Sequence, residues 1–305
     1  MDDDALLLTL EPTVERLYER HLATTKEWFP HELVPYSRGR DAEPDRAWDE
    51  RDADLAGASL NDAVRSSLIV NLLTEDNLPY YFRTIERMFG ADGIWGTWAR
   101  RWTAEEGRHS MAIYGYLMVT RAVDPVDLER SRMAQVSGGI IPEPCSAADG
   151  VVYVALQELA TRIAHRNTGR MIGDEAGYAV MMRVAADENL HHLFYRDLVT
   201  AAIAIDPSAL MQAIERQVVD FEMPGAGIPG FAAHARAIAK AGVYDLAIHH
   251  NQILAPVVER HWDIEHLEGL DADAEQARDR LMARLVKSGR VARRVAERKE
   301  ELAVA

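Results

Sequence analysis

Cysteine is almost absent from this chain. Among its 305 residues there is one, Cys145, so an intrachain disulfide is excluded. Near absence of cysteine fits a reducing compartment, and we expect a cytoplasmic protein. Cys145 lies in a proline-rich stretch without a matching His and Asp set, so we interpret it as incidental.

Long apolar runs and an excess of positive charge are also missing. No run approaches the roughly 18 residues of a membrane span, and the chain opens Met-Asp-Asp-Asp instead of with a basic and then apolar signal peptide. We therefore expect neither a span nor a signal peptide. The formal net charge of −15 argues against a nucleic-acid binder, which would carry a basic face.

Glycine and proline are sparse, at 19 and 12 residues, while 48% of the chain is apolar. This composition predicts an ordered globular protein, and we find no convincing strand pattern. We predict an all-α fold in one domain spanning 1–305, a ferritin-like four-helix bundle with additional flanking helices. The bundle core covers about 59–205, and outer helices lie in 5–27 and 206–299.

Within the core, a helix is expected from an N-cap at Ser59 to about Met88, kinked near Pro79. The first outer helix carries an apolar stripe that includes Leu17 and Leu22, and prolines at 30 and 35 end it. Further helices are expected at 92–123, 126–137, 147–171, 175–205, 230–241, 244–262 and 271–299, with loops at 36–58, 138–149 and 223–229.

Two Glu-x-x-His motifs stand in this predicted bundle, Glu106 with His109 and Glu188 with His191. They are the only two matches in the chain. On a helix this spacing places both side chains on one face, one turn apart. A carboxylate and an imidazole so placed can hold one metal ion together.

Each motif follows a single glutamate at nearly the same interval, because Glu75 precedes Glu106 by 31 residues and Glu158 precedes Glu188 by 30. We interpret this as a duplicated helical hairpin. Two such hairpins give the ligand set of di-iron and di-manganese carboxylate bundles. Four buried carboxylates repel one another unless two divalent cations neutralise them. The ligand types suit iron or manganese, and the sequence does not choose between these metals.

Neighbouring residues suggest supporting roles. Asp187 can accept the free N–H of a ligating histidine, and Thr161 lies one turn after Glu158 with a hydroxyl on the same face. Trp28 and Trp102 are candidates for an electron route. Some other aromatic and histidine residues look tempting, but we assign them to core packing or to surface and helix-cap positions: Trp95, Trp98, His249, His250, His261 and His266.

At these motifs the chain resembles the soluble acyl-[acyl carrier protein] desaturases, especially their actinobacterial branch. The matching segments are Thr74-Glu-Asp-Asn-Leu-Pro-Tyr80, Trp102-Thr-Ala-Glu-Glu-Gly-Arg-His109, Gln157-Glu-Leu-Ala-Thr-Arg-Ile-Ala-His-Arg-Asn-Thr-Gly169 and Ala186-Asp-Glu-Asn-Leu-His191. Similarity is densest from about 59 to 205 and covers most of the chain more thinly.

The resemblance implies a homodimeric enzyme with two carboxylate-bridged iron ions (Fe2+). Such enzymes take electrons from ferredoxin, use O2, and place a cis double bond in a fatty acyl chain carried on acyl carrier protein. It also implies that Thr161 lies near the oxygen site and that Trp28 and Asp187 line an electron route to a ligand histidine. The implied metal ligands are Glu75, Glu106, His109, Glu158, Glu188 and His191.

Departures from the family pattern concern substrate choice more than the metal ligands. Gly107 replaces the usual Asn, Asn189-Leu190 differs from the plant Lys-Arg, and the 138–149 loop is short. Acyl carrier protein is acidic in this family, so we expect a basic docking patch. Candidates are Arg38, Arg40 and Arg46, or the run Lys287, Arg290, Arg293 and Arg294.

Two other functions remain open from the sequence. One is a di-iron hydroxylase or oxygenase acting on a carrier-bound acyl chain in a specialised pathway. The other is a non-catalytic, ferritin-like metal-binding protein. The long additional helices argue against simple storage, and the presence of all six ligands argues against a silent scaffold.

Overall fold

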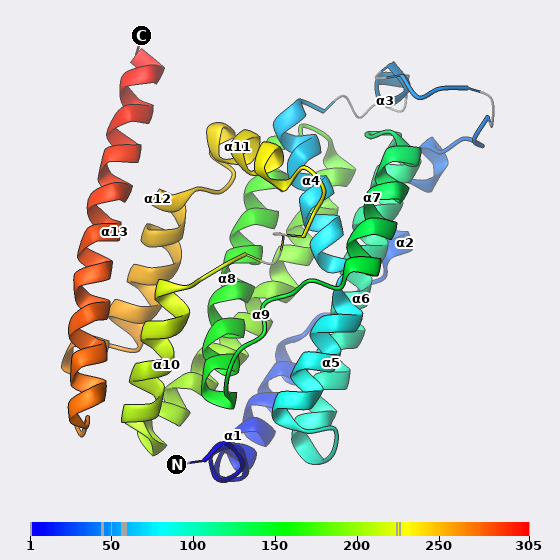
Figure 1. Cartoon of the computed structure of the whole chain (residues 1–305). Coiled ribbons are helices and arrows are strands. Elements are labelled where there is room, and N and C mark those ends of the chain that lie inside the picture. The colour runs from blue at the N-terminus through cyan, green and yellow to red at the C-terminus, as the bar shows by residue number, and fades with distance from the viewer. Residues whose placement is uncertain are drawn as a thin grey trace.

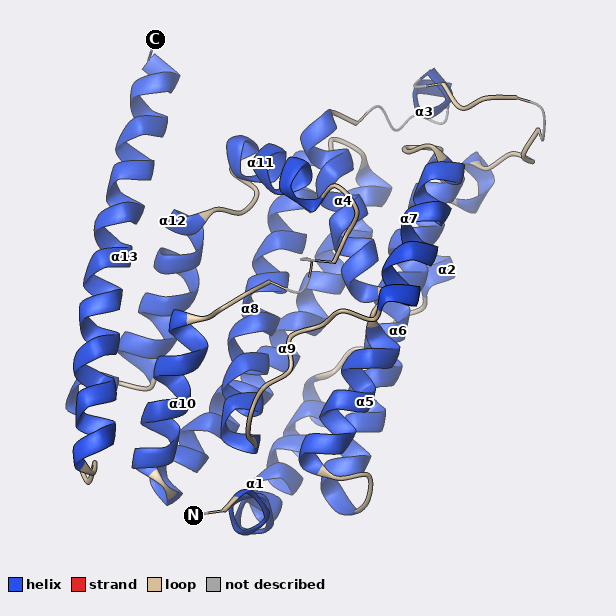
Figure 2. Cartoon of the chain, in the orientation of Figure 1, coloured by secondary structure: helices blue, strands red, loops and turns tan. Residues whose placement is uncertain are grey.

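The computed structural model describes residues 2–43, 46–49, 51–55, 60–223, 225 and 227–304. Every regular element in these ranges is a helix, as Figure 2 shows, which confirms the all-α prediction. Ser59, the expected helix cap, lies outside the described residues. Asn61 caps the helix instead, where its side chain accepts a hydrogen bond from the backbone N–H of Val64.

Four long helices form the bundle (Figure 1): α4 (Asp62–Glu75), α6 (Gly93–Thr120), α8 (Ala147–Met171) and α9 (Glu175–Ile205). The side chains of Ser146 and Asp174 cap α8 and α9, and Gly173 turns the chain between them with a φ of 70°. Most of α8 is buried on all sides, because α4, α9 and outer helices pack around it. The bundle interior is therefore shielded from water.

The helix expected to run from 59 to 88 is two helices, α4 and α5 (Leu78–Phe89). Pro79 has no N–H to donate to the carbonyl of Glu75, so an unbroken helix would lose that bond. Asp76 holds the break in place, since its carboxylate accepts hydrogen bonds from Ser110 at 2.6 Å and from Arg132 at 2.5 Å. The expected single kinked helix was thus wrong, and α4 ends at Glu75 itself.

The first outer helix, α1 (Asp3–Thr24), ends before Pro30 because the backbone turns extended at Thr25. Its buried stripe runs through Leu17 to His21, whereas Leu22 is 44% exposed, so placing Leu22 on the stripe was wrong. The remaining elements are α2 (Pro30–Leu33), η1 (Tyr36–Arg38), α3 (Arg51–Leu55), α7 (Pro125–Gly138), α10 (Pro207–Val219), α11 (Phe231–Ala241), α12 (Leu246–His249), the π-helix η2 (His250–His261), η3 (Ile264–His266) and α13 (Ala272–Val304).

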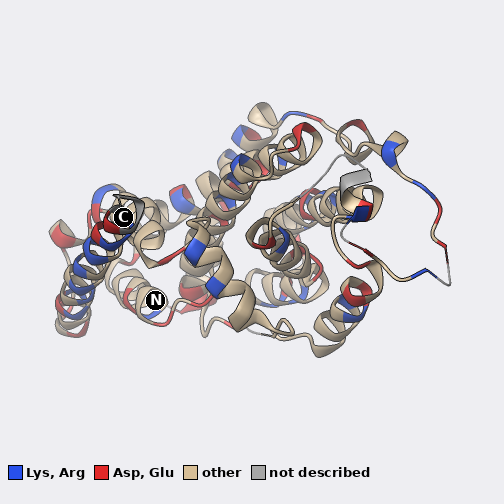
Figure 3. Cartoon of the chain, turned by 90° about the horizontal axis from the view of Figure 1, so that it is seen from above, with Lys and Arg blue, Asp and Glu red and all other residues tan. Residues whose placement is uncertain are grey.

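These outer helices cover the bundle on two sides (Figure 1): α1 packs on α9 and α6, while α10 lies between α8 and α13. Seen from above, Lys and Arg are interspersed with Asp and Glu along α13, the helix that carries the C-terminus (Figure 3). Within the described residues, no helix is long and apolar enough to cross a membrane.

Candidate metal centre

The six predicted metal ligands converge in the middle of the bundle. Glu75 comes from the last turn of α4, Glu106 and His109 from α6, Glu158 from α8, and Glu188 with His191 from α9. None of the six is more than 6% exposed. Burial of four carboxylates and two imidazoles side by side is costly unless something compensates their charge.

Their oxygen and nitrogen atoms form two overlapping groups, each able to surround one ion. In both groups all ligand atoms lie within 4.8 Å of one another. Glu106 and Glu188 belong to both groups. Glu75 and His109 complete the first, and Glu158 and His191 complete the second. This arrangement suits two ions bridged by two carboxylates.

The ligand atoms point at a common space instead of satisfying one another. Nδ1 of His109 lies 3.2 Å from Glu106 and 3.3 Å from Glu188, and Nδ1 of His191 lies 2.8 Å from Glu106. Within the part of the chain that the structure describes, neither Nδ1 has a partner in hydrogen-bond geometry, and Oε1 of Glu106 and Oε2 of Glu158 also lack one. Buried polar atoms without partners are rare, so this donor set fits bound cations.

Electrostatics supports the same conclusion. Burial, followed by the negative charge of Glu188, raises the pKa of Glu106 and of Glu158 above the ordinary glutamate value. Without positive charge in the centre these carboxyl groups therefore tend to hold protons. Divalent cations would displace those protons and supply the missing charge.

Asp187, which was predicted to accept the free N–H of a ligating histidine, lies behind His109. Its Oδ2 lies 3.5 Å from Nε2 of His109 and accepts a hydrogen bond from Nε1 of Trp28 at 2.7 Å. Arg183, one turn earlier on α9, donates to its other oxygen. The structure thus joins Trp28, Asp187 and His109 in one chain of contacts that reaches the metal centre.

Glu105, a residue to which the sequence analysis assigned no role, lies behind His191. Its Oε2 lies 3.0 Å from Nε2 of His191 and 2.8 Å from Nε2 of His21 on α1. Arg101, one turn earlier on α6, donates to its Oε1 at 2.6 Å. Glu105 is 2% exposed, so it is a buried carboxylate with three donors around it.

Asp187 and Glu105, the two acidic residues that support the ligand histidines, are related by the same duplication as the ligands. Each motif reads Arg-x-x-x-acid-Glu-x-x-His, at 101–109 and at 183–191. The acidic residue of each helix supports the histidine of the other helix, so the two supports cross between α6 and α9. The repeated Arg and acidic residue were available in the sequence as a signal for Glu105.

Other polar groups contact the ligands directly. The hydroxyl of Thr161 donates to Oε2 of Glu188 at 2.7 Å, and Nε1 of Trp102 donates to Glu158 at 3.0 Å. Nε2 of His165, to which the sequence gave no role, lies 3.1 Å from Oε1 of Glu75. Trp102 thus contacts a predicted ligand directly, and its place on an electron route stays a prediction.

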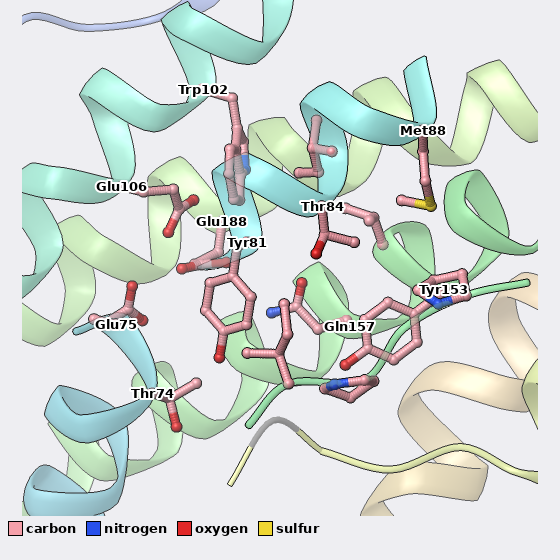
Figure 4. Close-up of a pocket in the computed structure, with 15 residues that line it drawn as sticks. Thr74, Glu75, Tyr81, Thr84, Met88, Trp102, Glu106, Tyr153, Gln157 and Glu188 are labelled. Carbon is pink, nitrogen blue, oxygen red and sulfur yellow. The ribbon is translucent and has the colours of Figure 1, made fainter. Parts of the chain in front are cut away.

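A narrow pocket lies beside the candidate metal centre (Figure 4). It is lined by Glu75, Glu106 and Glu188 at its inner end. Apolar and aromatic side chains from α5, the 141–144 loop and α8 form its walls: Tyr81, Ile85, Met88, Ile141, Pro142, Pro144, Tyr153 and Val154. Its volume is about 40 Å³, enough for small molecules such as water, so entry of a long chain requires wall side chains to move.

The other candidates lie elsewhere. Within the described ranges, the groups of possible metal ligands contain none of His249, His250, His261 and His266. His266 is instead bound to Asp263 at the surface. Cys145 is exposed and unpaired, and Trp95 and Trp98 are buried in the core.

Comparison with known proteins gives consistent matches over nearly the whole chain. A family model described as "Fatty acid desaturase" matches residues 3–304. DesA1 of Mycobacterium tuberculosis, which is named as an acyl-[acyl-carrier-protein] desaturase, is 42% identical over 289 residues, covering 92% of this chain and 84% of that protein. Acyl-[acyl-carrier-protein] desaturase 7, chloroplastic, of rice (Oryza sativa) is 31% identical over 303 residues, covering 91% and 73%.

The fold also matches a solved structure. DesA2 of Mycobacterium tuberculosis, titled as an acyl-ACP desaturase, aligns with a TM-score of 0.72 and 27% sequence identity, over 90% of this chain and 99% of that chain. This match confirms the ferritin-like bundle predicted from the sequence. With a family model over almost every residue and relatives above 30% identity, the chain belongs to the fatty acid desaturase family.

Proposed function

We propose that this protein is an acyl-[acyl carrier protein] desaturase that removes two vicinal hydrogens from a carrier-bound acyl chain. The observation that carries the proposal is the pair of buried Glu and His ligand groups, which share Glu106 and Glu188 and lie at the inner end of an apolar pocket. The names of its relatives supply the substrate class. An unactivated C–H bond requires a strong oxidant kept away from water, and a buried site inside a bundle provides that isolation.

The proposed cofactor is a pair of Fe2+ ions. Glu75 and His109 would hold one ion, Glu158 and His191 the other, and Glu106 and Glu188 would bridge them. Bound iron supplies the reduction of O2 that makes C–H cleavage possible. The protein's own residues orient these ligands, exclude water, and place the acyl chain along the pocket walls.

Three further features of the proposal rest on the sequence resemblance. They are electron supply by ferredoxin, a homodimer, and a cytoplasmic location. The hydrogen bond of Trp28 to Asp187, and the contact of Asp187 with His109, support an electron entry at this side of the centre. The single exposed Cys145 is compatible with a reducing compartment.

Mass spectrometry of the product tests the proposal. The iron-loaded protein is incubated with ferredoxin, its reductase, O2 and acyl carrier proteins that carry different chain lengths. Loss of two hydrogens from the acyl chain is the expected result. A gain of one oxygen atom would indicate the hydroxylase alternative, and unchanged chains with two irons bound would favour a non-catalytic metal-binding protein.

Replacing Thr161 with valine is expected to lower the product formed per O2 consumed. The bridging carboxylate of Glu188 loses the hydroxyl that orients it, while the side-chain shape is nearly kept. The measurement is O2 uptake together with product yield. Thr168→Val is the matched control, because this buried threonine of α8 bonds Ser67 and touches no predicted ligand. An unchanged ratio in Thr161→Val would reduce Thr161 to a packing role.

The basic candidates for carrier docking differ in availability. Arg38 is paired with Asp174, and Arg40 and Arg46 are paired with Asp52. The run on α13 is exposed, but Figure 1 shows α13 at the opposite edge of the molecule from α5, whose residues line the pocket. Exposed Arg83 and Arg87 on α5 adjoin the pocket residues Thr84 and Met88 and are better placed. Arg87 also forms an ion pair with Glu143 at 3.5 Å, but both side chains of this pair are exposed at the surface.

Reversing Arg83 and Arg87 to glutamate is therefore expected to raise the KM for acyl carrier protein about tenfold at low salt, because two attractive rim charges become repulsive. The effect should shrink as ionic strength rises. The matched control is the double variant Arg290→Glu and Arg294→Glu, which has the same i,i+4 spacing on α13. If only the α13 variant raises KM, docking takes place on α13.

A further inference from the structure

A second and larger cavity lies among the outer helices, away from the metal centre. It is an open cavity lined by the C-terminal end of α10, the end of α11, α12 and α13, and its volume is about 620 Å³. Small-molecule sites typically measure about 300–1,000 Å³. None of its lining residues belongs to the metal centre, so desaturation does not account for it.

The cavity is elongated along α13. Its residues Arg284, Ser288, Val295 and Lys299 line one side and recur on one face of the helix. At about 1.5 Å per residue, the 15 steps from Arg284 to Lys299 span roughly 22 Å. Figure 1 shows α13 standing beside α10 first and, further toward the C-terminus, beside α12. A long, narrow molecule fits such a space better than a compact one.

One end of the cavity is apolar. Val218, Phe221 and Met223 line it where α10 ends, and Leu254 of the π-helix η2 lines it from the other side. The ring of Phe221 stands 4.8 Å from the ring of His249. Burial lowers the pKa of His249 to about 4, so this imidazole is neutral at physiological pH and adds no charge to the wall.

The other end is cationic. Lys240 from α11 and Lys299 from α13 line it, and Lys299 is paired with Asp245. Among the described residues, Lys240 has no carboxylate within ion-pair distance. Arg284, a third cation of the lining, lies about 22 Å along α13 from Lys299. This end therefore carries two cations against one carboxylate, in a chain whose formal net charge is −15. That contrast favours an anionic ligand at this place.

We propose that this cavity binds a long-chain carboxylate, with its carboxylate at Lys240 and Lys299 and its chain lying along Val295 toward Phe221. The volume, the length, the apolar end and the cationic end each match one part of such a molecule. The apolar end also adjoins the metal-centre pocket. Phe221 lies 6.0 Å, ring to ring, from Tyr153, which lines that pocket, and the Tyr153 hydroxyl donates to the carbonyl of Glu222.

Calorimetric titration of the whole, metal-loaded chain with dodecanoate tests the proposal, and 1-dodecanol serves as the ligand without charge. Saturable binding of dodecanoate is expected, at least tenfold tighter than that of the alcohol. Lys240→Glu should weaken it at least tenfold. Arg293→Glu, on the opposite face of α13, should change it less than twofold. Val295→Trp, which narrows the cavity on the proposed path of the chain, should weaken it at least tenfold.

Binding in the metal-centre pocket is separated by Met88→Trp, which narrows that pocket and should leave dodecanoate binding intact. Loss of binding in Met88→Trp with retention in Val295→Trp would overturn the proposal. Wild-type affinity in Lys240→Glu, or equal affinity for the alcohol, would overturn it as well. Lys240 is exposed, so its variant gives an answer even if Val295→Trp fails to fold.

Discussion

Replacing His191 with alanine is expected to lower bound metal from two ions per chain to one or fewer and to abolish desaturation. His191 supplies the nitrogen of the second ligand group, and among the described residues its Nδ1 has no hydrogen-bond partner. Loss of one ion removes several kcal/mol of transition-state stabilisation, so activity should fall on the order of 10³-fold or more. Metal analysis of the purified variant is the primary measurement.

The next residue provides the matched control. His192 is also buried on α9, but its Nδ1–H donates to the backbone carbonyl of Ala155 at 2.8 Å, and it belongs to no ligand group among the described residues. His192→Ala should therefore destabilise the fold by about 2 kcal/mol while keeping both ions. Full metal content in His191→Ala, or equal metal loss in both variants, would remove His191 from the proposed ligand set.

The positions of the six proposed ligands followed from the sequence because they depend on local rules. Helical spacing places Glu106 with His109 and Glu188 with His191, and the near-equal intervals to Glu75 and Glu158 reveal the duplication. The partners that cross between helices do not follow from such rules. The contact of Glu105 with His191 exists because α6 packs against α9, and His21 joins it because α1 packs on both.

The break between α4 and α5 shows the same limit. Pro79 predicts weakening of the helix but does not determine whether the chain bends or starts a new helix. Here Arg132 of α7 and Ser110 of α6 bind Asp76, and these tertiary hydrogen bonds stabilise the break. The narrow pocket volume depends likewise on the rotamers of side chains from separate elements, which no sequence pattern specifies.

The crossed supports behind the histidines give the second large effect. Glu105→Gln is expected to weaken the ion held by His191, and Asp187→Asn the ion held by His109, each by about 10–100-fold in affinity. An amide keeps the shape but loses the charge that favours a ligating imidazole. Competition with a chelator measures both affinities. Asp197→Asn is the control, because this aspartate of α9 pairs with Arg20 and Arg196 outside the centre.

The two variants should differ in a way that the duplication does not predict. Glu105 lies 3.0 Å from its histidine, whereas Asp187 lies 3.5 Å from its own and also accepts a bond from Trp28. We therefore expect Glu105→Gln to cost more metal affinity, and Asp187→Asn to slow reduction of the centre by ferredoxin more than its metal loss explains. Equal affinity losses together with equal reduction rates per bound iron pair would show that the two supports are interchangeable, and Trp28 would then have no separate role in electron entry.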